Sequence, residues 1–97
     1  MRYLGKLEPA NTTSENNATT GTPFSIPAGA RELILLTSAS GMAVSFGTDD
    51  TIASTGDTGF PLTPNQALTV QRGAVWTHVA VWNGSGGAAS VRVWGGY

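Results

Sequence analysis

The sequence contains a single histidine, His78, and no cysteine, which limits the chemistry that the chain can perform. A catalytic histidine works with a nucleophile and with a group that orients its ring, and no motif of the sequence supplies either. A zinc site would need further nitrogen or sulfur ligands, which the sequence does not contain. We therefore predict that His78 is a structural or surface residue, and that the chain has no catalytic residue and no cofactor.

Three carboxylates, Asp49, Asp50 and Asp57, share a stretch rich in glycine, threonine and serine. Oxygen ligands of this kind could hold Ca²⁺, although the spacing is not that of an EF-hand. Aspartate beside threonine and glycine is also typical of turns, because its carboxylate accepts hydrogen bonds from nearby backbone amides. We favour the turn and predict no metal, and calcium binding by this loop stays open as the alternative.

The three tryptophans point to contacts with other molecules. Trp76 and Trp82 occupy one face of a predicted strand over 75–82, opposite a valine face, and Trp94 ends the last predicted strand. Pairing of these two strands would bring Trp76 or Trp82 close to Trp94. A sheet that is apolar on both faces in so small a chain favours an interface, so we predict Trp76, Trp82 and Trp94 at a subunit contact. Ordinary packing and a sugar-stacking platform are the alternatives.

Short apolar runs separated by turn signals position these residues. Phe60-Pro61-Leu62 is expected at a sheet edge, because proline cannot donate to a strand ladder. The stretch 83–87 is expected to join the last two strands as a hairpin. About eight short strands predict an all-β, single-domain β-sandwich or jelly roll. The expected strands are 2–7, 24–26, 32–38 (central in its sheet), 42–46, 60–62, 67–70, 75–82 and 89–94.

The first 23 residues differ in composition from the rest. After a short strand at 2–7, the stretch 9–23 is rich in Asn, Thr and Ser and has no apolar periodicity. A structureless stretch of this length in a small domain is normally functional or a linker. We predict an extended N-terminal arm and strand at 1–23, followed by the sandwich at 24–97, and we expect the arm to contact a larger assembly through Arg2, Tyr3, Leu4, Asn11, Asn16 and Asn17.

Composition and charge exclude several classes of protein. Charged residues are only 11% of the 97 residues, and the net charge is −1. The five basic residues are dispersed, so duplex nucleic acid is not an expected partner. No apolar run is longer than Leu33 to Leu36, which is far shorter than the roughly 20 residues of a membrane span, so no membrane partner is expected.

Three segments carry a resemblance to a known group of proteins. They are Val44 to Asp50 (VSFGTDD), Gly59 to Val70 (GFPLTPNQALTV), and the pair Val79 to Trp82 with Ser90 to Val93. Together they resemble small virion proteins of tailed bacteriophages, over roughly Phe24 to Trp94. Asn65-Gln66 stands where many such proteins carry Pro-Gly.

The resemblance implies a β-sandwich that serves as a capsid decoration (cement) protein or a small tail component, commonly as a homotrimer. We therefore expect a non-enzymatic structural protein on the capsid exterior, with the major capsid protein and further copies of itself as partners. The alternative is a carbohydrate- or receptor-binding module of a phage tail or fibre.

Overall fold

The computed structural model describes residues 1–11, 23–71 and 76–97, and these contain eight strands and no helix. The predicted all-β fold is confirmed. The strands are β1 (Arg2–Leu7), β2 (Phe24–Ser25), β3 (Glu32–Leu36), β4 (Met42–Gly47), β5 (Phe60–Leu62), β6 (Leu68–Gln71), β7 (His78–Asn83) and β8 (Val91–Gly96).

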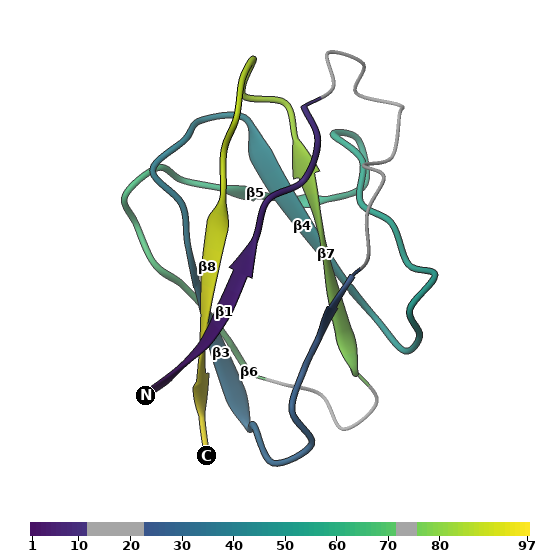
Figure 1. The fold of residues 1–97 in the computed structure, drawn as a ribbon, viewed down its shortest axis with the longest axis vertical. Helices are drawn as coiled ribbons and strands as arrows, with labels where there is room; N and C mark the ends of the chain where they lie inside the picture. Colours follow the sequence, from purple (N-terminus) through teal and green to yellow (C-terminus); the bar gives the residue numbers. More distant parts are fainter. Residues whose placement is uncertain (12–22, 72–75) are drawn as a thin grey trace.

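Two antiparallel sheets of four strands build the molecule (Figure 1). The first sheet has the order β1-β8-β3-β6 and the second has the order β2-β7-β4-β5. Alternation along each strand directs one set of side chains inward, where they form a single core. The central strands supply most of it: Leu33, Leu35, Val91 and Val93 from the first sheet, and Met42, Val44, Val79 and Val81 from the second. This arrangement confirms the small β-sandwich.

The positions of two strands agree with their sequence patterns. β3 lies between β8 and β6, as its apolar residues on both faces predict. β5 is an edge strand, and its Pro61 lies opposite Ala43 of β4. An edge position suits proline because the missing amide is not needed by a further strand.

The predicted hairpin between the last two strands is wrong. β7 pairs with β2 and β4, whereas β8 pairs with β1 and β3, so the chain crosses from one sheet to the other between them. The buried Asn83 ends β7, and its side-chain oxygen accepts hydrogen bonds from the amide and hydroxyl of Ser85. These bonds turn the chain away from β7, and the connection over 84–90 is long enough to reach the other sheet.

The sandwich begins at β1 rather than after residue 23. β1 pairs with β8 from Arg2↔Gly95 to Leu7↔Val91, with a bulge between Tyr3 and Gly5. Its Leu4 and Leu7 pack against the core. The expected boundary between 23 and 24 therefore does not separate β1 from the domain. Of the predicted arm, residues 8–11 are described and 12–22 lie outside the described residues.

Candidate functional site

The outer face of the first sheet carries aromatic and apolar side chains in register. The side chains of Leu33 and Leu35 in β3 point into the core, so Ile34 between them points outward. Strand pairing aligns Tyr3 with Trp94, Trp94 with Ile34, and Ile34 with Thr69, which makes one row across all four strands. A second row aligns Lys6, Arg92 and Leu36. We call Tyr3, Ile34, Leu36, Arg92 and Trp94 the outer apolar face.

This outer apolar face is accessible in the single chain. Tyr3 is 52% exposed, and Ile34, Leu36 and Trp94 are each half-buried. The Tyr3 and Trp94 rings meet edge to face, with centroids 5.4 Å apart and an interplanar angle of 62°. The guanidinium of Arg92 lies 5.4 Å from the centroid of the Trp94 ring, a cation–π distance. The face therefore combines an aromatic pair with one positive charge.

An ion pair between two residues close in sequence lies at the edge of this face. Lys6 Nζ lies 2.7 Å from Glu8 Oε1, and the hydrogen bond and charge of Glu8 raise the pKa of Lys6. Among the described residues Arg92 has no carboxylate partner, so its charge is available to an approaching molecule.

The other two tryptophans pack within the chain. Trp82 lies on the outer side of the second sheet beside Ala43, yet it is only 9% exposed. Its ring lies against Gly84, where a Cβ would overlap it. Trp76 stacks on Phe46 with ring centroids 4.8 Å apart and an angle of 14°.

The predicted meeting of Trp76 or Trp82 with Trp94 is therefore wrong, because β7 and β8 belong to different sheets. The subunit contact itself stays a prediction, and of the three residues Trp94 has the position that suits it.

The predicted arm contacts fall in different surroundings. Arg2 is exposed, with its guanidinium 5.7 Å from the Tyr97 ring centroid, and Tyr3 belongs to the outer apolar face. Leu4 packs against the core, because the alternation that points Tyr3 outward points Leu4 inward. Asn11 is exposed, and its Oδ1 accepts a hydrogen bond of 2.9 Å from the Gly86 amide. Asn16 and Asn17 lie outside the described residues.

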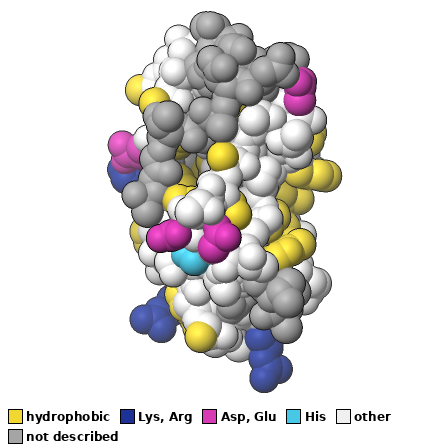
Figure 2. Space-filling model, turned by 90° about the vertical axis from the view of Figure 1, so that its right-hand side faces the viewer, with side chains coloured by type: hydrophobic (Ala, Val, Ile, Leu, Met, Phe, Trp, Pro, Cys, Tyr) yellow, Lys and Arg dark blue, Asp and Glu magenta, His cyan; other side chains and the backbone are white. Residues whose placement is uncertain are grey.

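The loop that contains Asp49 forms a turn, and His78 bonds a neighbouring threonine. Asp49 Oδ1 accepts hydrogen bonds from the hydroxyl (2.6 Å) and the amide (2.9 Å) of Thr51. These bonds lower the pKa of Asp49, and the charge of His78 adds a smaller effect in the same direction. His78 Nδ1 lies 2.7 Å from Thr77 Oγ1. Figure 2 shows the histidine beside two acidic side chains. Nowhere in residues 1–11, 23–71 and 76–97 do three or more His, Asp or Glu side chains form a group that could hold a metal ion.

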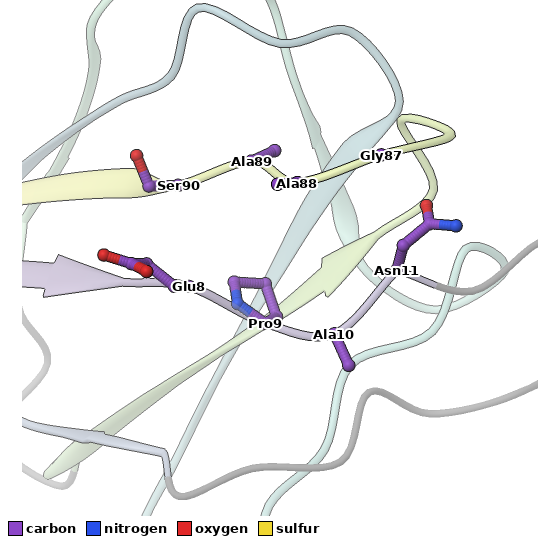
Figure 3. A pocket seen from close by; sticks show the side chains of 8 residues that line it. All are labelled: Glu8, Pro9, Ala10, Asn11, Gly87, Ala88, Ala89 and Ser90. Carbon is purple, nitrogen blue, oxygen red and sulfur yellow. The ribbon is translucent and has the colours of Figure 1, made fainter.

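Sequence reasoning missed a groove between two extended segments. Residues 8–11 follow β1 and residues 87–90 precede β8, and together they line a groove of about 520 Å³ (Figure 3). Its lining is made of Glu8, Pro9, Ala10, Asn11, Gly87, Ala88, Ala89 and Ser90. The available signals in the sequence were Pro9, two residues after the end of a strand, and the run of small residues at 86–89, which does not suit a regular strand.

No protein-family model matches this chain, and neither a curated protein nor a solved structure was found to be similar to it. The resemblance to small virion proteins therefore stays a prediction. In the part of the chain that the structure describes, no helix is long and apolar enough to cross a membrane.

Proposed function

We propose that this chain is a non-enzymatic structural protein of a phage virion, a decoration protein that binds the outside of the capsid lattice. The observation that supports it is the outer apolar face: an aromatic pair and two aliphatic side chains stand on a sheet that no other described element covers. Contiguous apolar surface of this kind marks interaction sites, because leaving it in water is unfavourable.

The chemistry of the face suits a protein partner. Tyrosine, tryptophan and arginine are the residues most enriched at interface hot spots. Arg92 brings a charge that a carboxylate of the major capsid protein or of a neighbouring copy could pair. One face of this size gives a weak contact, and binding at many symmetry-related sites, or as the proposed homotrimer, raises the overall affinity about a hundredfold or more.

Cosedimentation of the purified full chain with undecorated capsids tests the proposal, together with its mass in solution. Trp94→Ala should lower capsid affinity by about 2 kcal/mol, roughly thirtyfold, as expected for a central aromatic residue. Phe60→Ala is the matched control, since Phe60 is 59% exposed but lies in β5 of the second sheet. Equal occupancy of native protein and the Trp94 variant, or no binding by the native protein, would refute the proposal.

The pair of the exposed Tyr3 and the half-buried Trp94 also favours a second candidate, a carbohydrate-binding module. Sugar rings stack on aromatic faces, but here Arg92 already lies over the Trp94 ring. A sugar would have to displace that guanidinium, which makes a protein contact the better fit. Saturable quenching of tryptophan fluorescence by a soluble oligosaccharide, abolished by Trp94→Ala and kept in Phe60→Ala, would favour the sugar.

A further inference from the structure

The ladder between β1 and β8 ends at one side of the groove. Leu7↔Val91 is the last pair of the ladder, and residues 8–11 and 87–90 continue beyond it as the two walls of the groove (Figure 3). Pro9 explains the stop, because it has no amide to donate to the facing segment. The groove is therefore a place where a sheet has opened while both walls remain extended.

A buried side chain holds the walls in place. Asn83 is fully buried, and its Nδ2 donates to the carbonyl of Pro9 on one wall and to that of Gly87 on the other, at 3.1 Å each. The Asn11 side chain bonds the Gly86 amide at the same end. A buried amide that bonds both walls makes the groove a fixed feature of the fold rather than a loose gap between loops.

The walls offer main-chain hydrogen-bonding groups that the described residues leave unused. In the described part of the chain, no hydrogen bond uses the amide of Ala10 or the amides and carbonyls of Ala88 and Ala89. These main-chain groups are therefore available to a ligand. Most residues on the walls are small: three alanines, a serine, a proline and a glycine, which has no side chain. A ligand backbone can therefore approach closely.

We propose that this groove binds an extended peptide segment with small side chains, supplied by a partner protein, which lies along the groove and pairs with its free main-chain groups. Addition of a strand to open main-chain groups is a recurring mode of peptide recognition. The carboxylate on the lining belongs to Glu8, which is already paired with Lys6, so the walls provide main-chain polarity rather than charge to the ligand. The proposal does not depend on the capsid function.

The test uses the ¹⁵N-labelled full chain and a capped octapeptide of alternating serine and alanine. We expect saturable amide shifts at 8–11 and 87–90, with a Kd on the order of 1 mM. Exchange of the Ala88 and Ala89 amides with solvent should slow by about twofold or more at saturation. Ala88→Pro removes one of the free amides and should weaken binding about fivefold, the effect of one hydrogen bond. Ala67→Pro, an exposed position before β6 at the other edge of the sheet, should bind like the native chain.

Three results would overturn the proposal. Main-chain pairing needs no particular side chain, so the absence of shifts at about 10 mM peptide is one of them. Shifts of the same amides by chitotetraose and not by the peptide would assign the groove to a sugar. Shifts of these amides on dilution of the protein alone would assign it to a second copy of the chain.

Discussion

Replacing Asn83 is the sharpest test of how the crossover between the sheets is held. Asn83 is fully buried at the end of β7, and its amide group makes four hydrogen bonds. Nδ2 donates to the carbonyls of Pro9 and Gly87, and Oδ1 accepts from the amide and hydroxyl of Ser85. Asn83→Ala removes all four and leaves both carbonyls and both donors without that partner.

The structure sets the expected size of this effect. Gly87 is exposed and Pro9 is half-buried, so water can replace part of the bonding to their carbonyls. Counting about 1 kcal/mol for each side of the amide, and up to about 1 kcal/mol for the cavity, Asn83→Ala should lower the free energy of unfolding by about 2–3 kcal/mol. That is a large fraction of the 5–15 kcal/mol typical of a whole domain.

Asn83→Asp should make the stability of the protein depend on pH through the same position. One carboxylate oxygen would keep the two Ser85 donors, and the other would face the carbonyl oxygens of Pro9 and Gly87. Burial and these carbonyls should raise the pKa of the introduced carboxyl in the folded state above the unfolded value of about 3.9. The folded state then binds more protons, so stability should fall as pH rises from about 4 through the raised pKa, and return as pH falls.

Urea unfolding followed by tryptophan fluorescence measures both effects. The slope of the free energy against urea should stay unchanged, since the surface exposed on unfolding is the same. Ser85→Ala is the control: it removes the 2.6 Å hydroxyl bond to Asn83 and that hydroxyl's 3.1 Å bond to the Gly87 carbonyl, and should cost about 1 kcal/mol without pH dependence. The reasoning fails if the free energy of unfolding of Asn83→Ala lies within about 0.5 kcal/mol of that of the native chain. It also fails if the stability of Asn83→Asp does not depend on pH between about pH 4 and pH 8.

Two further predictions concern other elements. Gly84→Ala places a Cβ in overlap with the Trp82 ring and should lower the free energy of unfolding by about 2 kcal/mol. Gly87→Ala, with open space around its Cβ, should change it by less than about 0.5 kcal/mol. Equal melting temperatures for the two variants would contradict this prediction. Thr51→Val removes the hydroxyl that contributes most to the lowered pKa of Asp49, so that pKa should rise toward its ordinary value, as followed by NMR titration of the carboxyl carbon; an unchanged titration would show that the amide bond alone sets it.

Several features of the fold could be read from local sequence alone. Period-two alternation identified the inward positions of β4 and of the valine-rich strands, and Pro61 indicated an edge. The loop before β5 was expected from its Asp, Thr and Gly content, and Asp49 does form a turn with Thr51. These features depend on neighbouring residues in the chain, so a sequence is enough to determine them.

The candidate binding surfaces depended on contacts that the local sequence does not encode. β8 pairs with β1 and β3 rather than with β7. The alternating patterns of these strands are similar, so the local sequence does not specify which of them pair. That choice leaves Trp94 beside Tyr3 on the first sheet, whereas Trp82 lies on the outer side of the second sheet and is only 9% exposed, although both tryptophans lie on the face opposite the valines in their strands. The groove likewise exists because Asn83 bonds both of its walls, and one of these bonds joins Asn83 to Pro9, 74 residues away in the sequence. Secondary structure was therefore determined by the sequence of each segment, whereas the exposure of each aromatic ring was decided by long-range strand pairing, because burial is a property of the packed sheets and not of any one strand.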